Sequence, residues 1–137
     1  MTPIVIDCSV AVSWLIESER STSGDAILNA IRNSGAHVPS LFWFEVANVM
    51  NVAVRRKCLT VGDVRPRLDL LAALPIKTDA DCWTRATGET TLIAQTNALT
   101  IYDAAYLELA LRLGARLATF DQDLRKSAAA LGVGLIA

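Results

Sequence analysis

The sequence has few of the residues on which several enzyme classes depend. Its single histidine, His37, precedes a proline, and no GxSxG elbow is present, so a Ser-His-Asp site is not expected. Neither a P-loop nor a GxGxxG motif occurs, which argues against the common glycine-rich nucleotide sites. The three cysteines, Cys8, Cys58 and Cys82, form no CxxC pair and no zinc spacing, so we interpret them as core or near-surface residues.

Long apolar runs are also missing. No run approaches the roughly 18 residues of a membrane span, and the first residues, MTPIVIDCSV, lack the basic segment of a signal peptide. We therefore expect a cytoplasmic protein without membrane contact. The net charge of −1 argues against a general nucleic-acid-binding surface, although it allows a local basic rim.

What is present is the composition of a folded domain. The 137 residues are 53% hydrophobic and 20% charged, which predicts one globular domain over 1–137. Short β-branched runs alternate with helical patterns, which favours an α/β fold with a mainly parallel sheet and helices on both faces. Strands are expected at 3–6, 37–39, 74–76, 115–120 and 133–136, and helices at 9–16, 22–33, 40–57, 60–73, from 79 or 81 to 97, at 101–113, and from 121 or 122 to 131.

Asp103 is an acid on the apolar side of its helix. On a helical wheel it lies within about 20° of Ala110, in the middle of the apolar arc. Glu108 and Arg112 fall together on the other side, as an i, i+4 pair that suits water. A carboxylate directed at a core must be paired, protonated or bound to a metal. The alternative is that Asp103 completes a capping box with Thr100.

Three further acids are expected near Asp103. Asp7 and Asp121 directly follow predicted strands, and sites in parallel sheets form at the carboxyl ends of strands. Glu45 lies at the edge of the apolar arc of its helix and is expected to be half-buried. Each has a simpler interpretation: Asp121 as a helix cap, Asp7 as a partner of local amides, and Glu45 as a solvated boundary acid. Asp123 fits a solvated first-turn acid better than a ligand.

Carboxylates gathered at one edge raise one another's pKa unless a cation compensates their charge. An all-oxygen ligand set suits Mg²⁺ or Mn²⁺ and disfavours zinc. Such an ion can clamp a phosphate and activate a water molecule, so the acids suggest phosphodiester hydrolysis. The three tryptophans and the aromatic cluster at 42–44 are interpreted as core or subunit-contact residues, with a base-stacking platform as the alternative.

The segments IVIDCSV, IYDAAYLELALRLG and LATFDQDL, together with the mid-chain Glu45, resemble the PIN-domain ribonucleases. The similarity is greatest to the VapC-type toxins of toxin–antitoxin pairs, and it spans nearly the whole chain in order. The resemblance implies a three-layer α/β/α fold with a five-stranded parallel sheet in the order 3-2-1-4-5. It also implies a Mg²⁺-dependent endoribonuclease that forms a homodimer and pairs with an antitoxin.

The resemblance assigns roles to individual positions. Asp7, Glu45, Asp103 and Asp121 match the catalytic, metal-binding acids of the family, with Asp123 as the least secure transfer. The hydroxyl residues Ser9 and Thr119 match positions that support those acids. Candidates for phosphate contact are basic residues, each of which could equally be a solvated helix-end charge: Arg55, Arg56, Lys57, Arg116, Arg125 and Lys126.

Two other functions are compatible with these residues. One is a different metal-dependent phosphoryl-transfer enzyme, such as a small phosphatase, in which the first aspartate is the nucleophile and a second acid follows two residues later. Ser9 occupies that second place, which counts against it. The other is a dimeric binding module that kept the fold but lost turnover, which a complete set of four acids argues against.

Overall fold

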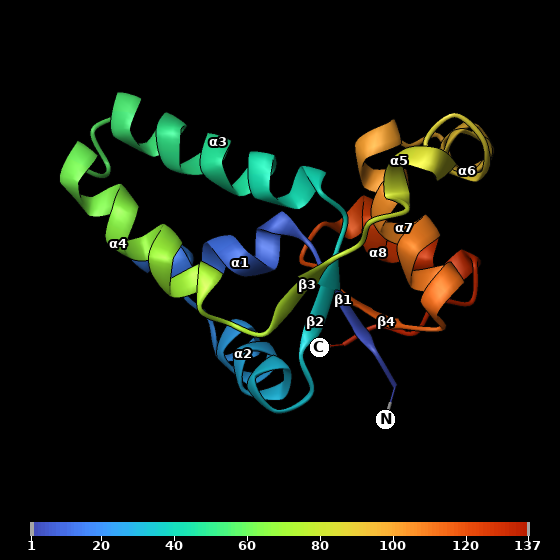
Figure 1. Cartoon of the computed structure of the whole chain (residues 1–137), viewed down its shortest axis with the longest axis horizontal. Coiled ribbons are helices and arrows are strands. Elements are labelled where there is room, and N and C mark those ends of the chain that lie inside the picture. The colour runs from blue at the N-terminus through green and yellow to red at the C-terminus, as the bar shows by residue number, and fades with distance from the viewer. Residues whose placement is uncertain (1, 137) are drawn as a thin grey trace.

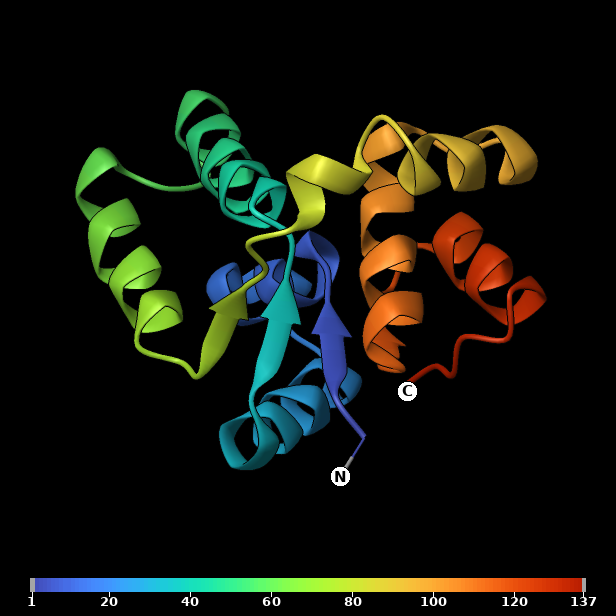
Figure 2. The same cartoon turned by 45° about the vertical axis from the view of Figure 1, so that its right-hand side comes forward.

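A parallel sheet forms the centre of the computed structural model, which describes residues 2–136. Its strands are β1 (Ile4–Ile6), β2 (Ala36–Val38), β3 (Ile76–Thr78) and β4 (Arg116–Ala118), paired in the order β3-β2-β1-β4. Figure 2 shows β1, β2 and β3 side by side and pointing the same way. The predicted α/β class is confirmed. The direction of strand addition reverses between β1 and β4, which is where such sheets place their sites.

The prediction of five strands is wrong for the described residues. At the expected fifth strand, one parallel bridge joins Leu135 to Leu117 of β4. The N–H of Leu117 donates to the carbonyl of Gly134 at 2.8 Å, and the N–H of Ile136 donates to the carbonyl of Leu117 at 3.0 Å. Glycines weaken a strand interior, and Gly134 lies within this segment while Gly132 directly precedes it. The segment therefore lies beside β4 without forming a strand.

Helices cover both faces of the sheet (Figures 1 and 2). The connections from β1 to β3 supply the helices of one side: α1 (Cys8–Leu15), α2 (Thr22–Ser34), α3 (Leu41–Arg55) and α4 (Val61–Ala72). The chain after β3 supplies those of the other side: α5 (Cys82–Arg85), α6 (Glu89–Asn97), α7 (Ile101–Leu113) and α8 (Gln122–Ala130). In the described part of the chain, no helix is both long and apolar enough to cross a membrane.

Two helix starts differ from expectation. The first helix is capped by Asp7, whose side chain accepts the N–H of Val10, and not by Ser9. The single helix expected up to Asn97 is divided into α5 and α6, and Gly88 lies at the break with φ −121° and ψ −104°. Glycine destabilises a helix interior because it loses more backbone freedom than other residues. The break turns α6 so that it can pack along α7.

The core surrounds α7. Residues 104–110 of this helix are all buried, so it is buried around its whole circumference rather than along one stripe. It packs against β1 and β4 on one side and α6 on the other. Its C-terminus is closed by Gly114, whose φ of 62° suits glycine. The helix that carries Asp103 is therefore fixed against the reversal point of the sheet.

Candidate active site

Asp7 lies where β1 ends, and only 6% of its surface is exposed. One carboxylate oxygen accepts the hydroxyl of Ser9 at 2.6 Å and the N–H of Val10 at 3.2 Å. The other oxygen accepts the hydroxyl of Thr119. Burial raises the pKa of Asp7, because desolvation disfavours its charged form, and these three hydrogen bonds oppose that rise. The carboxylate is therefore buried but fixed by donors on both sides.

The ends of β1 and β4 are joined by the same hydroxyls. The N–H of Asp7 donates to the carbonyl of Ala118 at 3.2 Å, which continues the ladder by one residue. The hydroxyl oxygen of Thr119, which is fully buried, accepts the N–H of Asp121 at 3.0 Å. The hydroxyl oxygen of Ser9 accepts the N–H of Phe120 at 2.9 Å. Both hydroxyls link the Asp7 carboxylate to the backbone that follows β4.

Asp121 caps α8, because its carboxylate accepts the N–H of Leu124 at 2.9 Å. The capping interpretation of this residue is confirmed. Its side chain is exposed, and its charge contributes to raising the pKa of both Asp7 and Asp103. Asp123 is exposed in the first turn of the same helix and adds a smaller effect on Asp103. Asp121 therefore lies within electrostatic reach of both other aspartates, and Asp123 within reach of Asp103.

Asp103 opens α7 in a half-buried position. The hydroxyl of Thr100 accepts the N–H of Asp103 at 3.1 Å, so the first half of the capping box exists. Among the hydrogen bonds of residues 2–136, the reciprocal bond from the Thr100 amide to the Asp103 carboxylate is absent. Burial, followed by the charge of Asp121, raises the pKa of Asp103. The Thr100 side chain lowers this pKa, so Asp103 interacts with both Thr100 and the neighbouring acid Asp121.

Glu45 joins the cluster from α3. It is half-buried, as predicted, and one of its oxygens accepts the phenol hydroxyl of Tyr106 at 2.5 Å. Burial raises its pKa, the Tyr106 hydrogen bond lowers it, and the charges of Asp103 and Asp7 raise it again. Sequence reasoning placed Tyr106 in the apolar arc and missed this contact. The contact could have been anticipated from the helical spacing, because Tyr106 lies one turn beyond Asp103 and therefore on the same side of α7.

The acids are electrostatically linked, but they do not converge on a single point. Within residues 2–136, no three Asp, Glu, Cys or His side chains lie together in a way that could hold a metal ion. The donor set itself, all carboxylate oxygen, fits a hard divalent cation such as Mg²⁺ or Mn²⁺. The pKa values of Asp7, Glu45 and Asp103 are all raised, which is the electrostatic conflict that a cation would relieve.

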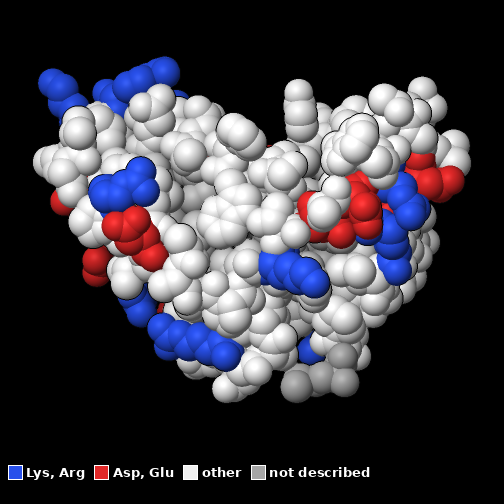
Figure 3. All heavy atoms as spheres, viewed as in Figure 1, with Lys and Arg blue, Asp and Glu red and all other residues white. Residues whose placement is uncertain are grey.

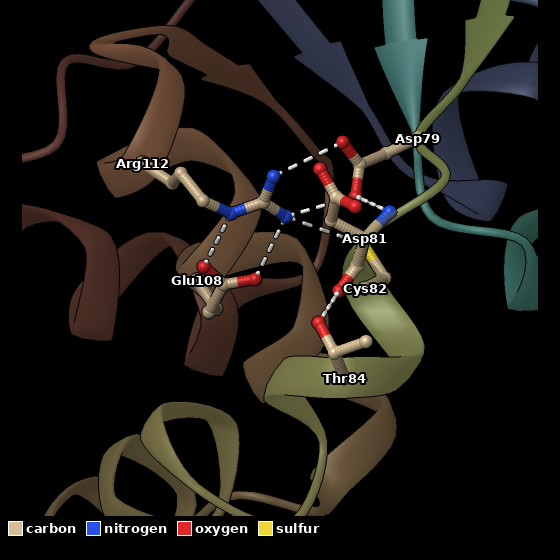
Figure 4. Close-up of polar contacts among 6 residues, drawn as sticks. All are labelled: Asp79, Asp81, Cys82, Thr84, Glu108 and Arg112. Carbon is tan, nitrogen blue, oxygen red and sulfur yellow. Dashed lines mark hydrogen bonds and ion pairs between the residues drawn. The ribbon is translucent and has the colours of Figure 1, made fainter.

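A second polar cluster lies across α7 from these acids, and it corrects two predictions. Glu108 and Arg112 were expected to face water, yet Glu108 is 4% exposed. Asp79, expected at the surface or as a cap, has a side chain only 13% exposed. Arg112 donates to both Asp79 oxygens, at 3.1 and 2.9 Å, and to both Glu108 oxygens, at 2.8 and 3.0 Å (Figure 4). This Arg112 cluster ties the end of β3 to α7.

A single guanidinium, that of Arg112, is shared by two carboxylates in this cluster, those of Asp79 and Glu108. Hydrogen bonds from Arg112 lower the pKa of Asp79 to about 2. Burial and the neighbouring Asp79 raise the pKa of the Cys82 thiol to about 12, so it stays protonated. A helical wheel shows that Glu108 and Arg112 share a face, but it cannot show that Asp79 arrives from 33 residues earlier in the chain.

The basic residues that are candidates for phosphate contact lie in separate parts of the molecule. Arg55, Arg56 and Lys57 are exposed where α3 ends, about 15 Å beyond Glu45 at 1.5 Å per helical residue. Figure 3 shows Lys and Arg side chains gathered at the tip of the arm formed by α3 and α4. Arg116 begins β4, at the opposite end from the acids. Arg125 lies beside the acids, since it donates to the carbonyl of Thr119 at 3.0 Å. Lys126 is exposed on the same helix, α8.

A family model described as the PIN domain matches residues 4–130, and the chain therefore belongs to this family. The resemblance inferred from the acidic segments is confirmed. Ribonuclease VapC3 from Pyrobaculum aerophilum is 26% identical over 128 residues, which cover 93% of this chain and 96% of that protein. The crystal structure of PAE2754 from Pyrobaculum aerophilum matches the fold with a TM-score of 0.72 at 19% identity, over 98% of this chain and 91% of that chain.

Proposed function

We propose that the chain is a Mg²⁺-dependent endoribonuclease, with Mn²⁺ as a substitute, and the toxin of a toxin–antitoxin pair. The observation that carries this proposal is the buried Asp7 at the reversal point of the sheet, which is linked electrostatically to Asp121 and Glu45, each of which is linked in turn to Asp103. Membership of the PIN family and the similarity to Ribonuclease VapC3 support it. This function places the protein in the cytosol with its RNA substrate.

Asp7, Asp103 and Asp121 would hold the ion, with Glu45 beside them and Asp123 as the least secure contributor. When bound, a divalent ion neutralises phosphate charge and lowers the pKa of a coordinated water. Ser9 and Thr119 would fix the Asp7 carboxylate in one orientation, since each donates to one of its oxygens.

Glu45 would act as the general base in this reaction. Tyr106 occupies its Oε1, which leaves Oε2 to accept a proton from the attacking water. The half-buried Glu45 lies within electrostatic reach of Asp7 and Asp103, so its free oxygen would be available beside the ion that those acids would hold.

The direct test is cleavage of single-stranded RNA with added Mg²⁺ or Mn²⁺. We expect Asp7→Asn and Asp103→Asn to reduce the rate by roughly 100-fold or more, because transition-state stabilisation by a metal amounts to several kcal/mol. Asp69→Asn removes an exposed acid of α4 and is the matched control. Cleavage that survives both active-site changes, or that continues in EDTA, would show that the proposal is wrong.

The proposed partners have separate tests. A homodimer should sediment at about twice the chain mass of 14.7 kDa. The cognate antitoxin should be encoded in the adjacent reading frame, and its purified product should bind the chain and inhibit RNA cleavage. A neighbouring product that neither binds nor inhibits would remove the toxin assignment while leaving the nuclease assignment in place.

A further inference from the structure

A small hollow beside Glu45 is not explained by the acids. It has a volume of about 250 Å³ and is lined by Leu41, Phe44, Glu45 and Asn48 of α3 and by Tyr102 of α7. Phe44 and Tyr102 are 78% and 64% exposed. We propose that this aromatic hollow binds one unpaired RNA base next to the bond that is cleaved. The inference rests on the proposed ribonuclease function and names a binding site for its substrate.

The positions of the two rings relate the hollow to the chemistry. Both rings line the hollow together with Glu45, which connects the hollow to the acidic cluster. The rings come from different helices, α3 and α7, which the Tyr106–Glu45 hydrogen bond holds together. A base seated between these rings therefore belongs to a nucleotide whose phosphate lies at the acids.

Exposed aromatic faces suit nucleobases for a general reason. Every base has a π-face, so stacking on Phe or Tyr adds affinity without requiring one sequence. The phenol of Tyr102 can also remain in water while its ring is covered. Two exposed rings that line the same hollow as Glu45 are thus a stacking surface, whereas Phe42 of α3 is fully buried and belongs to the core.

The remaining lining residues favour a base over a protein segment or the RNA backbone. Asn48, one turn beyond Glu45, is exposed and carries both a donor and an acceptor, which matches the mixed edge of a base. Glu45 is the one charged residue lining the hollow, and it repels phosphate, so a neutral base fits there better than the backbone. Only an unpaired base has a free face and edge, which restricts the substrate to single strands and loops.

The test measures binding separately from cleavage. The probe is a single-stranded oligouridylate that contains one 2-aminopurine, whose fluorescence is quenched by stacking, mixed with the Asp7→Asn chain so that it is not cut. We expect quenching, and roughly tenfold weaker binding by Phe44→Ala or Tyr102→Ala. Tyr102→Phe keeps the ring and should bind almost as the parent does. Leu70→Ala removes a 70% exposed apolar side chain of α4 and should have no effect.

Asn48→Ala tests whether the hollow reads the base edge. In a series of oligonucleotides that differ at the probe position, this variant should narrow the differences in affinity between bases without abolishing quenching. If neither aromatic change weakens binding, or if Leu70→Ala weakens it equally, the inference is wrong. If Phe44→Ala separates a dimer in sedimentation while RNA affinity is unchanged, the hollow is an interface between copies and the inference is again wrong.

The two proposals fail in different ways. A parent chain that cuts no RNA with Mg²⁺ or Mn²⁺ contradicts the ribonuclease, whatever the fluorescence shows. Cleavage by the parent chain, with unchanged KM in Phe44→Ala and Tyr102→Ala, contradicts only the base-binding hollow.

Discussion

At the scale of single residues, the site depends on hydroxyl groups as much as on acids. Asp7 would be an isolated buried charge without Ser9 and Thr119, and burying an unpaired charge is costly. Each hydroxyl does two things at once, since it donates to Asp7 and accepts a backbone N–H beyond β4. These contacts explain why hydroxyl side chains occupy the second residue of α1 and the residue directly after β4.

Thr119→Val tests this support, because valine keeps the shape and removes the hydroxyl. We expect RNA cleavage to fall roughly 10- to 100-fold, mainly through weaker metal binding, as for partners that orient metal ligands. The measurement is the cleavage rate as a function of Mg²⁺ concentration. Thr119→Ser keeps the hydroxyl and should retain most activity. Equal losses in both variants would instead indicate that the methyl group matters.

Tyr106→Phe tests the position of Glu45. The phenol hydrogen bond lowers the pKa of Glu45 against the rise caused by burial, so its removal should raise that pKa further. Glu45 would then lose its proton only at higher pH. The acidic limb of the pH–rate profile should therefore move to higher pH, with less change in the rate at the alkaline plateau. An unchanged profile would show that Glu45 does not control the reaction.

At the scale of secondary-structure elements, α7 has a distinct polar contact on each side. Tyr106 meets α3, and Arg112 meets the residues after β3. The side chain of Arg112 is 16% exposed, and its carboxylate partners are also mostly covered. Breaking a covered pair by removing one partner costs more than the pair itself contributes, because a buried charge is left behind.

Arg112→Met should lower the free energy of unfolding by about 3 kcal/mol, measured by urea denaturation at pH 7. Arg65→Met removes a comparable i, i+4 pair whose side chains are 75% and 65% exposed, and it should cost at most about 0.5 kcal/mol. A similar loss in both variants would contradict the structural role given to the Arg112 cluster.

The same variant, Arg112→Met, should also change how the free energy of unfolding depends on pH in the acid range. The pKa of Asp79 is about 2 when folded, below its ordinary value of 3.8. Its contribution to stability is therefore complete above about pH 4 and is lost as the pH falls toward 2. In Arg112→Met this contribution is missing, so the fall in unfolding free energy between pH 4 and 2 should be less steep than in the parent chain. Parallel curves would contradict the pairing.

Strand and helix patterns predicted which sheet edge Asp7 and Asp121 share. Asp7 and Asp121 could be placed together because the carboxyl ends of parallel strands share one edge of the sheet. Asp103 could be placed near them because the helical wheel put it on the apolar side of its helix. The Arg112 cluster could not be predicted, since a wheel describes one helix and Asp79 comes from elsewhere. The resemblance to the family suggested the four acids as a site, which stays a prediction, whereas the contact from Tyr106 to Glu45 depends on how α3 and α7 are placed in the fold.

At the scale of the whole molecule, the cluster of acids lowers the stability of the folded chain. The pKa values of Asp7, Glu45 and Asp103 are raised, so the folded chain binds protons more tightly than the unfolded chain does. Stability therefore falls as the pH rises through these pKa values. Burial of these carboxylates therefore costs stability at neutral pH.

A divalent cation should offset that cost. Mg²⁺ or Mn²⁺ at about 100 times its Kd should add about 2.7 kcal/mol to the unfolding free energy, seen as a rise of several degrees in Tm. The effect should be larger at pH 7.5 than at pH 5, where protons compete for the same oxygens. EDTA should reverse it, and Asp7→Asn should lack it. A salt of equal ionic strength with a monovalent cation serves as the control, and an equal rise with that salt would contradict a specific site.

The hydrogen bond between Asp7 and Thr119 spans 112 residues, and this has a consequence for synthesis. Ribosomes add about 5–20 residues per second, so Asp7 is made several seconds before the residue that fixes it. A nascent chain arrested before residue 119 lacks Thr119, Asp121 and the final helix, and we expect it to cut no RNA. In the proposed ribonuclease, the acids could therefore act together only after residue 121 has been made, and the RNA of the translating ribosome would not meet the assembled site before then. Cleavage by such an arrested chain would contradict this order of assembly.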